Sequence, residues 1–356
     1  MIFTISLLPT LREPSMANST HPIKITNGKK KGLRIFLKVP SEKKFCAKML
    51  HEGLRLQFNY PSHYPATNEE LFTQVMTLCQ LYKEINKPDE AIYLIQQFMP
   101  LFEKIKNADY IINLIELQAQ LVILDVFGDD AERLAKKSIA KTTRVPLSKQ
   151  VQNITKCQKA LAGLEIAIQF YKKKNDVPGL IKSYHTLAVI ETLQEDFPYA
   201  DHDCGTCIRY IAPDFNEFPD RIHVNDNVPI ELLPRLCDLL LLRGTLLRVL
   251  HEPVRAQHYL SLAYRFLQKS RASLIEDPVG KLQEEMSRGS DISRCLELMI
   301  ELTDSSIVEE KSNPNALPDR ITELERYRRS LVRKLNEAKD ELKRLNALLS
   351  AKYQTA

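Results

Sequence analysis

A pair of small residues twelve positions apart recurs four times along this chain of 356 residues. In each pair the first residue lies in one apolar-periodic segment, and the second, always an alanine, lies in the next. Two helices approach closely only where both carry small side chains at their crossing. The spacing therefore predicts four helical hairpins with tight crossings. The pairs are Cys79 and Ala91, Ala119 and Ala131, Ala188 and Ala200, and Gly244 and Ala256.

The segments around these pairs have helical periodicity. From about residue 68, apolar residues recur at i, i+3, i+4 and i+7, as in amphipathic helices. Short joints make successive helices antiparallel, and proline is well tolerated in the first turn of a helix. The chain has 10 glycines and no tryptophan, which argues against sandwiches, barrels and glycine-looped α/β enzymes. We predict an all-α fold with joints at Lys87-Pro88, Gly128-Asp129, Val177-Pro178, Phe197-Pro198 and Glu252-Pro253.

The register of these hairpins resembles the tetratricopeptide repeat, whose helices carry L-G-x-x-Y and A-x-x-x-F-x-x-A. The resemblance covers roughly residues 68–265 and implies a solenoid of antiparallel hairpins; an irregular helical bundle is the alternative. The long helix expected at 148–174 fits no repeat. The matching positions are Leu78, Cys79 and Tyr82 with Ala91, Ile95 and Phe98; Ala119 and Val122 with Ala131, Ala135 and Ser138; Leu187 and Ala188 with Ala200, Cys204 and Cys207; and Gly244 and Leu247 with Ala256, Leu260 and Ala263.

The resemblance also implies where a ligand binds. Members of this family bind peptides on the face lined by the first helix of each pair. In the chaperone-binding members, lysine and asparagine hold a peptide carboxylate, but Met76 and Gln80 stand at those positions here, so an extended or helical segment of another protein is the expected ligand. The implied groove positions are Thr73, Met76, Gln80, Lys83, Asn113, Glu116, Gln120, Ile123, Lys182, His185, Val189, Thr192, Asp238, Leu241, Thr245 and Arg248.

Three regions divide the chain. We expect a mobile arm at 1–40, a repeat domain at 41–310 with a loop insertion at about 212–230, and a C-terminal heptad helix at 318–352. Residues 1–50 hold ten lysines and arginines against two acidic residues, whereas the whole chain has a net charge of +5. The basic charge therefore belongs to the arm.

The basic arm has three interpretations. It contacts nucleic acid or directs nuclear import, it touches acidic lipid, or it is a solubilising tail. The first would make the protein a chromatin- or nucleic-acid-associated factor, which is the alternative to a protein-binding role. The basic residues at the centre of the arm are Lys29, Lys30, Lys31, Arg34 and Lys38.

The C-terminal segment carries a heptad seam with charged flanks, the pattern of a coiled coil. There are two interpretations of this seam. It packs against another chain and so forms a homo-oligomer or a larger complex, or it packs on the solenoid, which makes the segment a long capping helix. Arg328 within the seam would cost stability and select register or partner. The seam positions are Ile321, Leu324, Arg328, Leu331, Leu335, Ala338, Leu342, Leu345 and Leu349.

The stretch YADHDCGTC at 199–207 has a C-x-x-C spacing with a histidine and two aspartates beside it. A structural zinc site needs four ligands, and here only one such pair is present. Because Cys204 and Cys207 fall on core positions of a repeat, we predict that they pack as small apolar residues, with His202 and Asp203 on the outer face. TNGKKKG lacks the residues of a phosphate loop, and HEGLR and HEPVR lack the second histidine of a zinc protease.

These patterns predict a non-enzymatic adaptor with no metal and no cofactor. It would bind a partner segment in the groove and assemble through its C-terminal helix. Seven scattered cysteines favour a reducing compartment. The opening MIFTISLLPTL lacks the basic start of a signal peptide, and no segment is predicted to span a membrane. The expected location is therefore cytoplasmic, nuclear or both.

Overall fold

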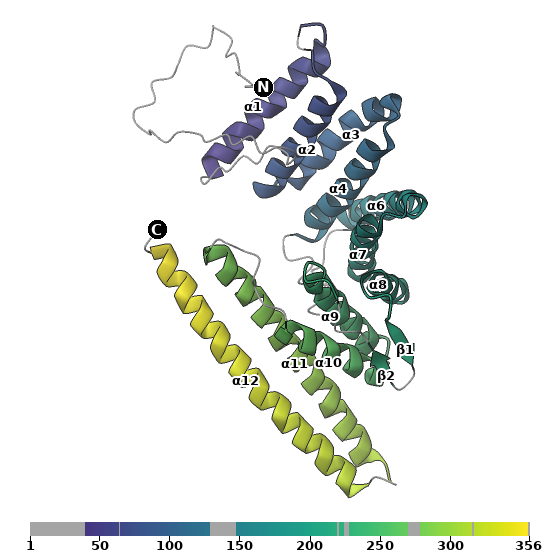
Figure 1. Cartoon of the computed structure of the whole chain (residues 1–356), viewed down its shortest axis with the longest axis vertical. Coiled ribbons are helices and arrows are strands. Elements are labelled where there is room, and N and C mark those ends of the chain that lie inside the picture. Colours follow the sequence, from purple (N-terminus) through teal and green to yellow (C-terminus); the bar gives the residue numbers. More distant parts are fainter. Residues whose placement is uncertain are drawn as a thin grey trace. The chain divides into compact units, whose positions relative to one another are not determined.

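A computed structural model of the chain describes residues 40–63, 65–128, 147–218, 221–223, 228–269, 278–314 and 317–354 (Figure 1). Helices dominate these ranges and pack consecutively, consistent with an all-α helical repeat; a short hairpin is the one departure there. The elements are α1 (Pro40–Asn59), α2 (Asn68–Glu84), α3 (Pro88–Ile105), α4 (Ala108–Phe127), α6 (Leu147–Lys174), α7 (Val177–Leu193), α8 (Phe197–Ile211), β1 (Asn216–Phe218), β2 (Arg221–His223), α9 (Leu233–Val249), α10 (Pro253–Lys269), α11 (Pro278–Ser312) and α12 (Pro318–Gln354).

The chain forms two compact units, Met1–Thr77 and Leu78–Ala356. In the described part of the first unit, α1 buries Ala47 and Leu54, which lie seven residues apart and share one helix face. The helix begins at Pro40. Proline suits this position because the N–H that it lacks has no partner within the helix.

Helix pairing in the second unit follows chain order, and each helix from α3 to α12 packs on the next described helix. Two further contacts, between α4 and α7 and between α9 and α11, join alternate helices. This arrangement stacks hairpins whose first helices are α4, α7, α9 and α11, and α6 is the second helix of the hairpin that α4 opens. The long helix that fitted no repeat therefore has a defined place. The positions predicted to pack on α4, Ala131, Ala135 and Ser138, lie outside the described residues.

The same joint recurs at four places in the described part of the chain. The helix ends on a residue in the left-handed conformation, and the next N–H donates to the carbonyl five positions back, which is a Schellman motif. A proline then stands in the first turn of the following helix. The left-handed residues are Asn86, Asn175, Glu195 and His251, and the closing bonds run from Lys87 to Tyr82, Asp176 to Tyr171, Asp196 to Glu191 and Glu252 to Leu247.

Replacing His251 with glycine should stabilise the fold. His251 is exposed and has φ 60°, a conformation that costs a side-chain-bearing residue about 1 kcal/mol or more. We expect the free energy of unfolding, measured by urea titration, to rise by about 0.5–1 kcal/mol. Gln97→Gly, at an exposed interior position of α3, should lower it by about 1 kcal/mol. Equal losses in both variants would contradict this expectation.

Close contacts occur at two of the four predicted pairs, those of Cys79 and Gly244. A Cβ on Gly244 would lie 2.8 Å from the side chain of Leu260 on α10. The Cys79 thiol donates to the Ala91 carbonyl across 3.8 Å. The α4–α6 crossing uses Gly163, where a Cβ would lie 2.9 Å from Ile115, and the sequence did not identify this contact.

The predicted insertion at 212–230 contains the antiparallel pair β1 and β2, with Glu217 opposite Ile222. Strand β2 contacts α10. The hairpin therefore ties part of the expected solvated loop to the body of the second unit. Residues 219–220 and 224–227 of this insertion lie outside the described residues.

Candidate functional site

Polar contacts join the first helices of successive hairpins along one face. Lys182 Nζ on α7 lies 2.6 Å from Glu116 Oε2 on α4. The Arg235 guanidinium on α9 and the His185 ring on α7 are 2.8 Å apart. Arg248 Nη1 on α9 lies 3.2 Å from Glu301 Oε2 on α11. Glu116, Lys182, His185 and Arg248 stand at predicted groove positions. The face of α4, α7, α9 and α11 that carries these contacts is here called the first-helix face.

Exposure differs among the predicted groove positions. Helices α4, α6 and α8 all contact α7, so its predicted groove positions are buried except for Lys182. Thr192 and Thr245 donate to carbonyls of their own helices. The accessible predicted positions are exposed Thr73 and Gln80 with half-buried Met76, Lys83, Asn113, Gln120, Lys182, Asp238 and Arg248, whereas Glu116, Ile123, His185, Val189, Thr192, Leu241 and Thr245 are buried.

Arg243 forms a buried cation site that the sequence did not indicate as such. Its side chain is 6% exposed, its Nε donates to Asp201 Oδ1 across 2.7 Å, and Nη1 donates to the Tyr259 hydroxyl. The guanidinium carbon lies 4.6 Å from the centre of the Tyr259 ring. A Cβ on Gly205 would lie 3.0 Å from that carbon, so this glycine leaves room for the cation. The available signal was a single arginine inside the apolar run LLLLRGTLL.

The two cysteines of YADHDCGTC are buried, as predicted. The Cys207 thiol donates to the Ile181 carbonyl across 3.3 Å. Burial raises the pKa of Cys207 to about 12 and raises that of Cys204 well above its ordinary value. Both thiols are therefore protonated and unreactive near neutral pH. His202 is exposed, but Asp203 is buried, which corrects its predicted place on the outer face.

Asp203 belongs to a cleft of about 760 Å³ between the start of α4 and helices α6, α7 and α8. Glu191 on α7 also lines this cleft and is 9% exposed. Burial, followed by the negative charge of Asp203, raises the pKa of Glu191 to about 8. Burial also raises the pKa of Asp203. Glu191 lies in the apolar stretch HTLAVIETL, and no sequence pattern singled it out.

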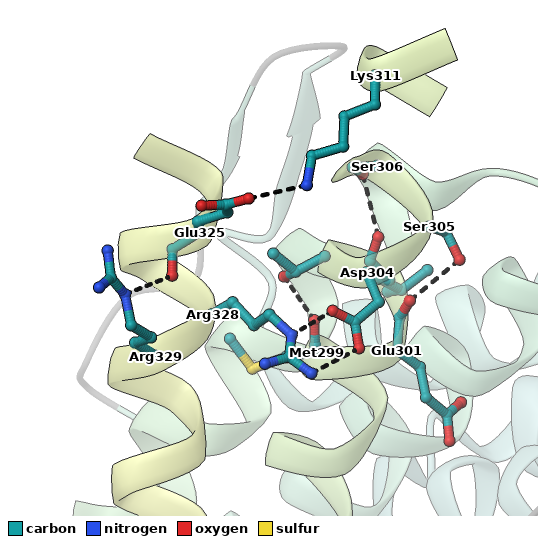
Figure 2. Close-up of polar contacts among 11 residues, drawn as sticks. Met299, Glu301, Asp304, Ser305, Ser306, Lys311, Glu325, Arg328 and Arg329 are labelled. Carbon is teal, nitrogen blue, oxygen red and sulfur yellow. Dashed lines mark hydrogen bonds and ion pairs between the residues drawn. The ribbon is translucent and has the colours of Figure 1, made fainter. Parts of the chain in front are cut away.

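The predicted heptad seam of α12 faces α11 in the same chain. Leu331 and Leu345 are buried, the remaining seam residues are half-buried, and Leu342 lies 2.9 Å from where a Cβ on Gly289 would stand. Arg328, the charged seam position, forms an ion pair with Asp304 on α11 (Figure 2). A second ion pair joins Lys311 and Glu325 across 2.9 Å. Helix α11 therefore covers the seam.

Leucine packing should contribute more to this hairpin than its ion pairs. The Arg328 and Asp304 side chains are 42% and 43% exposed, and ion pairs of this exposure contribute about 0–1 kcal/mol. Leu331 is 1% exposed. We expect Leu331→Ala to lower the free energy of unfolding by about 2–4 kcal/mol and Arg328→Ala by less than about 1 kcal/mol, measured by urea titration. The reverse order would contradict this.

The basic residues Lys29 to Lys38 lie outside the described residues. The described ranges contain no group of three or more histidine, cysteine, aspartate or glutamate side chains placed to hold a metal ion. Among those ranges, α4 is long and apolar enough to cross a membrane by length and composition. A buried helix of a soluble protein passes the same test, so this is weak support for a span.

No protein-family model matches the chain, and no curated protein is significantly similar to it.

Proposed function

We propose that this protein is a tetratricopeptide-like scaffold that holds a segment of a partner protein along its first-helix face. The observation that supports this most is the line of first helices α4, α7, α9 and α11, joined by polar contacts that each include at least one predicted groove residue. Helical solenoids bind partner segments on such continuous faces.

The repeat assignment has its own support. Four described joints are short and have the same Schellman bond, and small residues lie at the α4–α6 and α9–α10 crossings. Repeats of this kind stabilise one another through nearest-neighbour contacts, and the α4–α7 and α9–α11 contacts have that character. A terminal repeat must cover the last apolar face.

Helix α12 supplies such a cover, and we propose that capping is its first role. Its seam is covered by α11, which favours the capping interpretation over a seam offered to another chain. Light scattering should then give the mass of one chain for the full-length protein. A dimeric mass that falls to monomer in Leu324→Glu would instead support assembly through the seam.

The binding face is tested by blocking it with a bulky charged side chain. Gln120 and Asn113 on α4 are half-buried positions of the first-helix face, and Gln97 on α3 is exposed on a second helix. We expect Gln120→Arg and Asn113→Arg to reduce the recovery of crosslinked partner proteins at least ten-fold, because arginine would fill the space of the bound segment. Gln97→Arg should leave recovery unchanged. Unchanged recovery in both face variants, with thermal unfolding also unchanged, would contradict the proposal.

A further inference from the structure

The cleft beside α7 combines apolar walls with an acidic floor. Large side chains stand at its walls, and Ile166 and Tyr199 are 58% and 65% exposed although they are apolar or aromatic. Tyr184, stacked on Tyr210 at 5.9 Å between ring centres, forms a further part of the wall. Volumes of a few hundred to 1,000 Å³ with a few polar groups are typical of ligand sites.

The floor contains a buried carboxyl group, one oxygen of which has no hydrogen-bond partner among the described residues. Glu191 is more than nine-tenths buried, and its Oε2 has no hydrogen-bond partner among the described residues. A buried acceptor without a partner destabilises the fold because it has lost its hydrogen bonds to water. Asp203 adds a second carboxyl group at the same floor, hydrogen-bonded to the Glu191 carboxyl group. Two carboxyl groups this close raise the pKa of one of them, and a cation beside the pair favours the ionised form of both.

We propose that this cleft binds the guanidinium group of an arginine side chain, with Glu191 and Asp203 as its acceptors. That a partner polypeptide supplies this arginine rests on the proposed scaffold function. The existence of the guanidinium site does not.

Arginine fits this cleft better than other cations. Its planar group donates to two oxygens at once and stacks on aromatic rings, and Tyr184 and Tyr199 line the same cleft. Lysine would offer a point charge without the planar match. A metal ion would need more ligands than this pair, and the described ranges hold no group of three placed for one.

The cations already near the cleft do not fill this role. Lys172 and Lys173 on α6 are exposed at its edge, and neither forms an ion pair with Glu191 or Asp203 in the described part of the chain. Lys172 Nζ instead lies 5.8 Å from the centre of the Tyr184 ring. Both side chains are long and solvated, so they can turn away when a ligand enters.

The test uses N-acetyl-arginine amide as the probe and the full-length protein as receptor. Nuclear magnetic resonance titration should give a dissociation constant on the order of 1 mM, as expected of one side chain. N-acetyl-citrulline amide, of similar shape but uncharged, should bind at least ten-fold more weakly. Equal binding of the two probes would overturn the proposal.

Two variants locate the site. Glu191→Gln and Asp203→Asn keep the shape of each side chain and should each weaken arginine binding at least ten-fold. Glu103→Gln, an exposed position on α3, should leave it unchanged. Unweakened binding in both cleft variants would overturn the assignment. The groove variants Gln120→Arg and Asn113→Arg should not affect the probe, so failure of the scaffold proposal and failure of this one give different results.

A pH titration provides an independent readout. Below pH 8 the Glu191 carboxyl carries a proton in the free protein, and a bound cation would expel it. Affinity for the probe should therefore rise from pH 6 to 8, by up to ten-fold per unit, and should be flat in Glu191→Gln. A flat profile in the unmodified protein would count against the site. The other charged groups around Glu191 are Glu165 and Lys172 on α6, Asp203 and His202 on α8, and Asp196 in the joint.

Discussion

Arg243→Ala should lower the free energy of unfolding by about 3–5 kcal/mol, among the largest single-residue effects expected in the chain. The guanidinium is almost completely buried and contacts groups from two other helices, Asp201 on α8 and the Tyr259 hydroxyl on α10. Removing it leaves the carboxylate without its cation and the hydroxyl without that donor. It also removes the stacking of the guanidinium on the Tyr259 ring.

Urea titration followed by circular dichroism measures this loss. Arg209→Ala, an exposed arginine on α8, is the matched control and should change stability by less than about 0.5 kcal/mol. Gly205→Ala should reproduce part of the loss, about 1–3 kcal/mol, because its Cβ would displace the guanidinium. A loss below about 1 kcal/mol in Arg243→Ala would show that Arg243 is not an essential contact between these hairpins.

Glu191→Gln should change how stability depends on pH. The folded pKa of Glu191 is about 8, raised by burial above its ordinary value of 4.5. The folded protein therefore holds a proton between these values that the unfolded chain releases, so stability falls as pH rises from about 4.5 to 8. Glutamine resembles the protonated form and has no proton to lose. The variant should match the unmodified protein near pH 5 and exceed it at pH 8.5 by on the order of 3 kcal/mol.

Urea titrations at pH 5, 7 and 8.5 measure this difference. Glu103→Gln serves as the control because Glu103 is exposed. The stability of this variant should depend on pH as that of the unmodified protein does. A constant difference between Glu191→Gln and the unmodified protein across this range would mean that the Glu191 carboxyl ionises in the folded state as it does in the unfolded chain.

Local sequence patterns predicted the helices well because the start and the periodicity of a helix depend on residues that are close in sequence. Proline in the first turn and apolar spacing placed the starts of α3, α7, α8 and α10 at or within one residue of their observed positions. The joint between α3 and α4, at Lys106 and Asn107, was missed because no proline follows it. The Asn107 side chain caps α4 instead. An asparagine before an apolar run was the available signal.

The candidate site was less predictable from the sequence. The resemblance predicted which residues share the first-helix face, and contacts such as Lys182 to Glu116 occur there. It did not predict how much of α7 its neighbours cover, so His185 and Thr192 are buried instead of open to a ligand. Glu191 and Asp203 stand on successive helices and gain their shared cleft only from the packing of α6 and α8 on α7.

The sequence by itself determined the helical class, most of the joints and the small residues at two of the crossings, because helix formation, capping and close approach depend on local residue types. Only the tertiary structure decided that α6 pairs with α4, that α11 covers the α12 seam, and that Arg243, Glu191 and Asp203 are buried. Pairing and burial depend on which helices pack on each apolar face. The partner of a charged residue in an apolar run cannot be read from the neighbouring residues, because it comes from a helix distant in the sequence.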